Sequence, residues 1–188
     1  MNKLIFATGN KDKLREAGQI LGLELEGVDI EIDEIQSLNP LKVASKKAND
    51  YFAAVNKALF VDDVALTFAE IAPLPGTYIN DFLKTIGNAG LLKMLAGKEN
   101  RTATAYVTIA YTEPGMRVIT FQGVVTGTIA KEERGTSGFG WDTIFIPEGS
   151  KKTYAEMTDA EKNAGSSRTR ALKSLKEWLL KEKRFNLA

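Results

Sequence analysis

The sequence predicts a mixed α/β fold, and two patterns support this prediction. Short apolar runs alternate with amphipathic helical stretches in the first half of the chain, and two β-rich runs follow at residues 102–111 and 118–125. Glu113-Pro114-Gly115 separates these two runs and is typical of a hairpin turn. Because 44% of the 188 residues are hydrophobic, the chain can form a globular core. We therefore expect residues 1–188 to make a single domain without a separate linker.

Caps and turns place the elements of the first half. The apolar run at residues 4–7 predicts a strand, and the helical spacing of residues 11–21 predicts a helix with Asn10 as its N-cap. Asn39-Pro40 predicts the start of a second helix, because asparagine caps well and proline fits the first helical position. The remaining expectations are a strand and connection at residues 25–33, an end to the second helix near residue 55, and strands at residues 59–63 and 65–68.

The second half is expected to contain short elements joined by turns. In chain order these are a rigid turn at residues 73–76, helices at residues 78–86 and 88–95, the β-hairpin, a glycine-rich loop at residues 135–142, a strand at residues 143–146, a capping box formed by Thr158 and Glu161, and a final helix from residue 167 to about residue 183.

Composition excludes several classes of function. The net charge of +1, from 25 basic and 24 acidic residues, argues against a general nucleic-acid binder. The chain has no cysteine and no histidine, which excludes thiolate nucleophiles, Cys-ligated zinc, imidazole bases and serine–histidine triads. Any hydrolysis must therefore use carboxylates, lysines and a hard metal ion.

The hydropathy pattern indicates a cytoplasmic protein with no membrane partner. No stretch approaches the ~20 apolar residues that a membrane helix needs. The apolar run that ends at Ala7 is also too short for a signal peptide.

Thr8-Gly9-Asn10-Lys11-Asp12-Lys13 lies between the first strand and the first helix. A helix N-terminus presents unpaired backbone N–H groups and partial positive charge, which suits a phosphate. Lys13 lies in the first helical turn and can reach forward to a phosphate oxygen. The same pattern also fits a capped helix with solvated lysines.

Asp62-Asp63 follows an apolar run and is expected to end a strand. Adjacent acids repel each other unless a cation or proton intervenes, and Mg²⁺ typically takes one or two carboxylates plus substrate phosphates. The alternative is a turn in which the acids cap the next segment. The acidic stretch of Glu31, Asp33 and Glu34 offers one further metal ligand or, alternatively, solvated charges.

Two further motifs lie in the second half. Gly135-Thr136-Ser137-Gly138-Phe139-Gly140-Trp141-Asp142 combines glycines with two aromatic rings, which suits a loop that stacks on a flat base while Asp142 accepts a hydrogen bond from a ring N–H. A tight turn with both rings anchored in the core is the alternative. Lys162 and Arg168 flank the start of the last helix and can face an anion or a carbonyl oxygen, or serve only as surface charge beside a serine cap.

The order of these motifs resembles that of the inosine triphosphate pyrophosphatase family over nearly the whole chain. The matching segments are Thr8-Gly9-Asn10 with Lys13 and Glu16, Val61-Asp62-Asp63, Leu74-Pro75-Gly76 with Tyr78-Ile79, Phe139-Gly140-Trp141-Asp142, Lys152–Met157 and Glu161–Ala164.

This resemblance implies a fold, a reaction and an assembly. The implied fold has a twisted central sheet and two lobes that flank a nucleotide-binding cleft. The implied reaction hydrolyses the α–β phosphoanhydride bond of inosine, deoxyinosine and xanthosine triphosphates, releases a monophosphate and pyrophosphate, and needs Mg²⁺. The family also implies a homodimer.

The resemblance also implies residue roles. It assigns the phosphate-binding turn to Thr8, Gly9, Asn10 and Lys13, further substrate contacts to Lys46 and Lys162, and the metal site to Glu34 and Asp63. Asp63 is the expected general base, and Asp62 takes the place of its usual glutamate neighbour. The base-binding residues are expected to be Phe139, Gly140, Trp141, Asp142, Ser167 and Arg168.

Departures from the family pattern leave two alternatives open. Val64 replaces a usual serine or threonine, and Ser167 replaces a usual histidine of the base pocket. The protein is therefore alternatively an enzyme of the same fold that acts on other modified nucleotides, or a nucleotide-binding protein with weakened catalysis. We expect Ser167 to relax discrimination between inosine and guanosine triphosphates.

Overall fold

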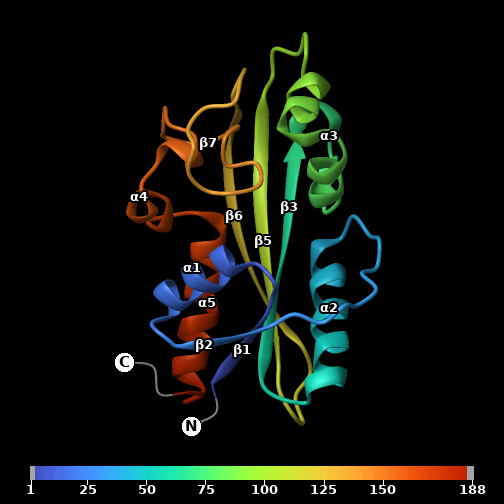
Figure 1. Cartoon of the computed structure of the whole chain (residues 1–188), viewed down its shortest axis with the longest axis vertical. Helices are drawn as coiled ribbons and strands as arrows, with labels where there is room; N and C mark the ends of the chain where they lie inside the picture. The colour runs from blue at the N-terminus through green and yellow to red at the C-terminus, as the bar shows by residue number, and fades with distance from the viewer. Residues whose placement is uncertain (1–2, 186–188) are drawn as a thin grey trace. The chain divides into compact units, whose positions relative to one another are not determined.

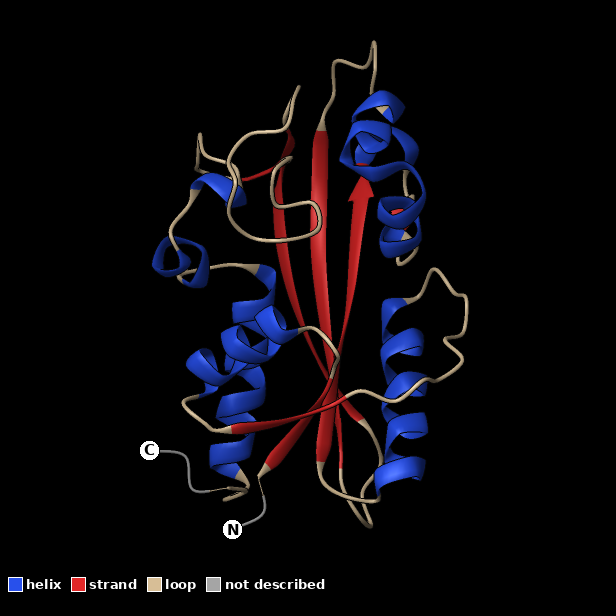
Figure 2. Ribbon diagram, viewed as in Figure 1, coloured by secondary structure: helices blue, strands red, loops and turns tan. Residues whose placement is uncertain are grey.

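The computed structural model describes residues 3–185 and contains one mixed sheet flanked by helices (Figures 1 and 2), which confirms the predicted α/β fold. Among these residues the strand order is β2-β1-β3-β5-β6-β7, and β4 pairs with β3. The strands are β1 (Leu4–Ala7), β2 (Leu25–Val28), β3 (Leu59–Phe68), β4 (Pro75–Gly76), β5 (Thr102–Thr112), β6 (Ile119–Ile129) and β7 (Phe145–Pro147). The helices are α1 (Lys11–Leu21), α2 (Pro40–Val55), α3 (Ile79–Met94), α4 (Asp159–Asn163) and α5 (Ser167–Lys181), with 3-10 turns η1 (Ala69–Ile71) and η2 (Tyr154–Glu156).

The chain divides into two compact units, and each is described by itself. Unit 1 comprises Met1–Asp63, Val107–Gly123 and Arg168–Ala188. Unit 2 comprises Val64–Tyr106 and Val124–Ser167. The expectation that residues 1–188 act as a single domain with two lobes stays a prediction.

The core of unit 1 forms on both faces of β1 and β3, which pair in parallel. On one face, α2 contributes Ala44, Ala48 and Tyr51 to a buried cluster with apolar side chains of β1 and β3. On the other face lie α1 and α5 (Figure 1), and the rings of Phe6 and Phe60 stack with centroids 4.4 Å apart. This two-sided burial explains why β1 and the first three residues of β3 are continuous apolar runs.

The helix caps follow the sequence predictions. Asn10 Oδ1 accepts hydrogen bonds from the backbone N–H groups of Asp12 (2.9 Å) and Lys13 (3.0 Å), and Asn39 caps α2 in the same way. Thr158 and Glu161 form the predicted capping box of α4. Gly87 has a φ of 63° and interrupts α3, so the prediction of two short helices there is confirmed.

The predicted boundaries of β3, β6 and β7 are wrong. β3 continues through Asp62-Asp63 to Phe68 as one strand, although the acids were expected to end it. Successive side chains of a strand point to opposite faces, so the two carboxylates enter different environments and neither has to leave the strand. β6 continues to Ile129, four residues beyond the predicted end at residue 125. The prediction for residues 25–33 is confirmed, because β2 ends at Val28 and an irregular connection follows up to Asp33. β7 begins at Phe145, because Trp141 O accepts the backbone N–H groups of Ile144 and Phe145 in a turn.

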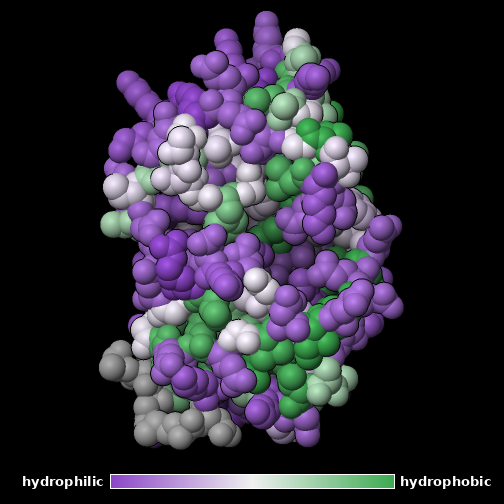
Figure 3. Space-filling model, in the orientation of Figure 1, coloured by the Kyte–Doolittle hydropathy of each residue, from purple (hydrophilic) through white to green (hydrophobic). Residues whose placement is uncertain are grey.

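Among residues 3–185, the exposed large hydrophobic side chains are Leu38, Leu41, Leu74, Ile86, Val124 and Leu180. Hydrophilic residues cover much of the face seen in Figure 3, with smaller groups of hydrophobic residues between them. Among the described residues, no helix is both long enough and apolar enough to cross a membrane.

Candidate active site

A polar pocket of about 270 Å³ lies in unit 1, at the carboxyl ends of β1 and β2. Three sections of chain meet there: the turn from β1 into α1, the irregular segment after β2, and the inner face of α2, with Asp62 contributed by β3. Its lining residues are Ala7, Thr8, Gly9, Lys13, Asp29, Ile30, Glu31, Ile32, Glu34, Lys47, Tyr51 and Asp62. The carboxyl edge of a parallel sheet is where open α/β folds bind ligands.

The predicted phosphate-binding turn forms one wall of this pocket. Thr8 Oγ1 accepts the backbone N–H of Asn10 (3.1 Å), and Asn10 caps α1, so the helix N-terminus has a fixed direction. A Cβ atom at position 9 would lie 2.1 Å from Asp29 Oδ2. Gly9 therefore lets the Asp29 carboxylate lie against the turn, and a larger residue would displace it.

Asp62 lies at the centre of a buried ion-pair network and binds two cationic side chains. Its carboxylate is 3% exposed; Oδ1 accepts from Lys13 Nζ (2.9 Å) and Oδ2 from Arg168 Nε (3.1 Å). Burial alone raises the pKa of Asp62, but Lys13 and Arg168 outweigh it and hold this pKa well below its usual range. Asp62 is therefore ionised at neutral pH and orients two cations.

Arg168 binds two carboxylates in unit 1. Its Nη1 donates to Glu16 Oε2 (2.8 Å) in addition to the contact with Asp62. Glu16 was part of the sequence pattern but had no role assigned to it. Its position one helical turn after Lys13 places both residues on the same side of α1, which is the signal that could have identified it.

Asp63 has the opposite character on the other face of β3. It is buried, and its Oδ2 has no hydrogen-bond partner among the described residues. Burial, together with the charges of Asp62 and Glu34, raises the pKa of Asp63 to about 7 against the opposing effect of Lys47 and Lys13. A carboxylate that titrates near neutrality can accept a proton from water, so the geometry suits a general base.

The second lysine of the pocket is Lys47. Its ammonium forms an ion pair with Glu34, and its side chain is 19% exposed. Lys46, which the sequence resemblance favoured, pairs instead with Asp50 (2.6 Å), is 48% exposed and does not line the pocket. Helical spacing could have found Lys47, because it lies three residues after Ala44 and four before Tyr51, both buried on α2.

Two acids of unit 1, Glu34 and Asp63, fit the requirements of a metal cation that also binds substrate phosphates. Among the described residues, no group of three His, Cys, Asp or Glu side chains is arranged to hold a metal ion. Glu34 and Asp63 are close enough to interact electrostatically, and Asp63 Oδ2 is a buried oxygen without a partner. Mg²⁺ commonly takes one or two carboxylates and completes its coordination with phosphates and water, so this pair fits it.

The predicted base-binding loop lies in unit 2 and forms a closed turn. Phe139 N–H donates to Asp142 Oδ2 (2.8 Å), and Asp142 N–H donates to Phe139 O (3.3 Å). Lys162 Nζ also donates to Asp142 Oδ2 (2.7 Å). Gly140 has a φ of 63°, and its carbonyl oxygen accepts from Asn88 Nδ2 (2.9 Å), a contact that sequence reasoning missed.

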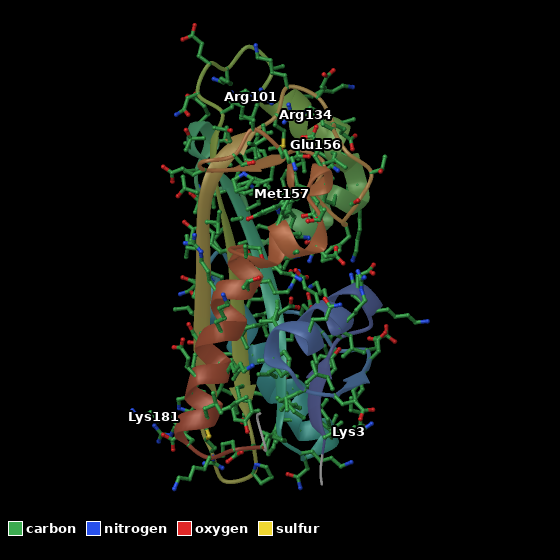
Figure 4. All side chains as sticks on the ribbon, turned by 90° about the vertical axis from the view of Figure 1, so that its left-hand side faces the viewer. Lys3, Arg101, Arg134, Glu156, Met157 and Lys181 are labelled. Atoms are coloured by element: carbon green, nitrogen blue, oxygen red, sulfur yellow. The ribbon has the colours of Figure 1, made fainter. Side chains whose placement is uncertain are left out.

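The first half of this loop is held against η2. Ser137 N–H donates to Ala155 O (3.2 Å), and a Cβ atom at Gly135 would lie 2.4 Å from the Ala155 carbonyl. Arg134 and Glu156 lie side by side at the start of the loop (Figure 4) and form an ion pair of 3.2 Å. The loop is therefore braced at both ends by unit 2 itself.

Comparison with known proteins identifies the family. The family model described as Ham1 family matches residues 4–178. The chain belongs to the Ham1 family.

Similar proteins extend this Ham1 assignment over nearly the whole chain. A dITP/XTP pyrophosphatase of Methanopyrus kandleri is 43% identical over 179 residues, which covers 94% of this chain and 95% of that protein. An inosine triphosphate pyrophosphatase of Yarrowia lipolytica is 43% identical over 181 residues, with the same coverage. A HAM1 protein structure from Coxiella burnetii has a TM-score of 0.85 and 28% identity, covering 96% of this chain and 100% of that one.

The sequence-predicted residues of this Ham1 chain fall into two assembled groups. In unit 1 the structure brings together Thr8, Gly9, Asn10, Lys13, Glu34, Asp62, Asp63 and Arg168, and leaves Lys46 outside the pocket. In unit 2 it brings together Phe139, Gly140, Trp141, Asp142 and Lys162, and Ser167 is buried at the first residue of α5. Their roles in binding and catalysis stay predictions.

Proposed function

We propose that this chain is a nucleoside triphosphate pyrophosphatase that hydrolyses inosine, deoxyinosine and xanthosine triphosphates to monophosphates and pyrophosphate. The observation that supports this best is the polar pocket of unit 1, which joins a capped helix N-terminus and two lysines, Lys13 and Lys47. Both lysines interact electrostatically with Asp63, the carboxylate with a raised pKa. Full-length relatives at 43% identity carry the names of this activity. Removal of deaminated nucleotides from the nucleotide pool is the physiological role that follows.

The reaction needs charge neutralisation and an oriented water molecule more than covalent chemistry. Lys13 and Lys47 would neutralise phosphate oxygens, and the N-terminus of α1 would add its partial positive charge. Asp63 would accept the proton of the attacking water. Asp62 would keep Lys13 directed into the pocket, since its own low pKa makes it a poor base.

Mg²⁺ is part of this proposal. Glu34 and Asp63 would hold it, and the bound ion would supply positive charge to the phosphates and lower the pKa of bound water. The orphaned Asp63 Oδ2 supports this pair as its ligands. Two finer parts of the proposal are a cytoplasmic location and a homodimeric assembly.

The direct test measures pyrophosphate release from inosine, xanthosine, guanosine and adenosine triphosphates, with Mg²⁺ and with EDTA. We expect Mg²⁺-dependent turnover of the inosine and xanthosine substrates. Asp63→Asn should lower kcat by about 10³-fold or more, which is in the range for loss of a general base with its electrostatic contribution. Asp50→Asn, which removes an exposed acid of α2, is the control and should change kcat less than about twofold.

Two negative results of this test would have different meanings. Absence of turnover with all four substrates would refute the proposed substrate class. Turnover that persists in Asp63→Asn would keep the substrate class and refute the assigned base.

A further inference from the structure

The segment of residues 29–37, between β2 and α2, forms neither helix nor strand and passes along α2 (Figure 1). Burial alternates in its first part: Ile30 and Ile32 are half-buried, and the acids at positions 29, 31 and 33 are exposed. Both isoleucines pack against the buried cluster that α2 forms with β1 and β3. Because this segment lines the pocket and carries Glu34, the contacts that hold it also decide where that carboxylate lies.

Tyr51 of α2 bonds the segment near its start. Its side chain belongs to the buried cluster and is 4% exposed. The hydroxyl donates to the backbone carbonyl oxygen of Ile30 at 3.1 Å, across 21 residues of chain. Since the acceptor is a backbone atom, this hydrogen bond constrains the path of the chain as well as the side chain of Ile30.

Lys47 bonds the segment further along, through its ion pair with Glu34. Residues four apart on a helix lie on the same side, so Lys47 and Tyr51 share one side of α2. Their partners, Glu34 and Ile30, are also four residues apart and occur in the reverse order along the chain. The segment is therefore attached at two points to the side of α2 that lines the pocket.

We propose that Tyr51 is a positioning residue that keeps Glu34 at the pocket by holding the backbone of residues 29–34. The residue acts through the Ile30 carbonyl and has no contact with the substrate in this role. The inference rests on the proposed function for the identity of the cation that Glu34 would hold. The attachment of the segment to α2 does not depend on that function.

The two attachments differ in how substrate would affect them. In the proposed function, Lys47 turns to phosphate oxygens and Glu34 to Mg²⁺, so their ion pair has to exchange partners when substrate binds. The hydrogen bond from Tyr51 to Ile30 involves no charged group and can remain. Tyr51 is therefore the attachment that serves both the empty and the occupied pocket.

Preorganisation explains why this attachment matters for Glu34. The side chain of Glu34 is 50% exposed and lies on an irregular segment, so little else restricts its conformations. Ordering a ligand group at the moment of binding costs conformational entropy and weakens the binding. A segment that Tyr51 has already fixed avoids part of this cost.

Tyr51→Phe tests this role, because it removes the hydroxyl and keeps the ring in the buried cluster. Tyr111→Phe is the matched control in the same unit. Tyr111 is buried and its hydroxyl donates to Glu113 Oε2 at 2.6 Å, but it does not line the pocket. Each variant loses one hydrogen bond of a buried tyrosine, so general destabilisation is common to both.

The first measurement is cleavage by glutamyl endopeptidase after Glu31 and Glu34, in EDTA and without nucleotide. Cleavage of a folded chain follows the population of its locally open form. Tyr51→Phe should raise the cleavage rate at these sites about fivefold, the factor that corresponds to one net hydrogen bond. Tyr111→Phe should cleave there like the unmodified chain, because opening of this segment does not involve Tyr111.

The second measurement is the Mg²⁺ concentration that gives half-maximal pyrophosphate release at saturating inosine triphosphate. Tyr51→Phe should raise it about fivefold and change kcat at saturating Mg²⁺ less than about twofold, because the segment must now be ordered when the cation binds. A merely structural role would lower the amount of folded enzyme and leave the Mg²⁺ requirement unchanged. Tyr111→Phe should keep the Mg²⁺ requirement of the unmodified chain.

Unchanged cleavage in Tyr51→Phe overturns the proposal, whether or not the chain hydrolyses any triphosphate. Faster cleavage with an unchanged Mg²⁺ requirement in an active chain also overturns it, because Glu34 then does not depend on the attachment. Faster cleavage in a chain that hydrolyses no triphosphate supports the hold of Tyr51 on the segment and contradicts the proposed function, so the two failures are distinguishable.

Discussion

Asp62 and Asp63 are adjacent in the chain and differ in almost every physical property. Asp62 binds two cations and has a lowered pKa, whereas Asp63 has a buried oxygen without a partner and a raised pKa. The pleat of β3 separates them, because alternate side chains enter opposite faces of the sheet. Asp62 thus orients Lys13 and Arg168, whereas Asp63 can gain or lose a proton near neutral pH.

The raised pKa of Asp63 predicts how stability depends on pH in the metal-free chain. Below the ordinary pKa of 3.8 the side chain is neutral in both folded and unfolded states; above about 7 it must be charged in the folded state, where burial opposes charge. The stability that the neutral form provides is therefore lost as pH rises from about 4 through 7. Asp63→Asn cannot charge, so it should stabilise the chain at pH 8 by as much as ~4 kcal/mol and by almost nothing at pH 4.

Urea unfolding in EDTA at pH 4, 6 and 8 measures this difference. Asp50→Asn, at an exposed ion pair, should show no comparable trend. Equal effects of Asp63→Asn at pH 4 and pH 8 would mean that folding does not raise the pKa of Asp63.

The two neighbouring lysines of α2 provide a second prediction. Lys47 lines the pocket beside Glu34, and Lys46 lies on the exposed face beside Asp50. Lys47→Met should lower kcat/KM for inosine triphosphate by about 10²-fold, as expected when one charged contact to the reacting phosphates is lost. Lys46→Met should change it less than about threefold; the reverse ranking in a steady-state assay would restore Lys46 as the substrate-binding residue.

Two helices of unit 1 begin with the same cap but have different surroundings. Asn10 and Asn39 each accept two backbone N–H groups at the start of α1 and α2. Only the start of α1 carries pocket-lining residues, Thr8, Gly9 and Lys13. We therefore predict that the cap of α1 has both a structural and a functional consequence.

Replacing the two caps separates these consequences. Asn10→Ala and Asn39→Ala should each lower the free energy of unfolding by about 1 kcal/mol. Asn10→Ala should also lower kcat/KM by about tenfold or more, because the turn that faces the phosphates loses its fixed geometry. Chemical denaturation and kinetics on the same samples provide the comparison, and an equal loss of activity in both variants would refute a specific role for the turn.

For the whole molecule, the proposed assembly is a homodimer, as the resemblance to the inosine triphosphate pyrophosphatase family implies. Light scattering coupled to size-exclusion chromatography should therefore give about twice the 20.6 kDa of one chain. A mass of one chain over the micromolar range would refute a stable dimer. The balanced charge of +1 also leads us to expect no measurable retention on immobilised DNA at physiological salt.

The sequence by itself determined the elements whose signals are local. Asn10 and Asn39-Pro40 located two helix starts, and Thr158 with Glu161 located a third. Each of these depends on residues within one or two helical turns, so neighbours in the chain contain the whole signal. The order of the motifs also identified the family, because chain order survives where individual residues change.

Only the tertiary structure decided the partners of the charged residues. Arg168 meets Glu16 and Asp62, which lie 152 and 106 residues away in the chain, and no local pattern specifies those pairs. The same is true of β3, where the sequence suggests that the strand ends at Asp62-Asp63, but the strand continues and buries both acids. Electrostatic energy depends on distance in space and on burial, so the fold sets the pKa of each carboxylate. The fold therefore also sets the different roles that we propose for Asp62, which orients two cations, and Asp63, which acts as the base.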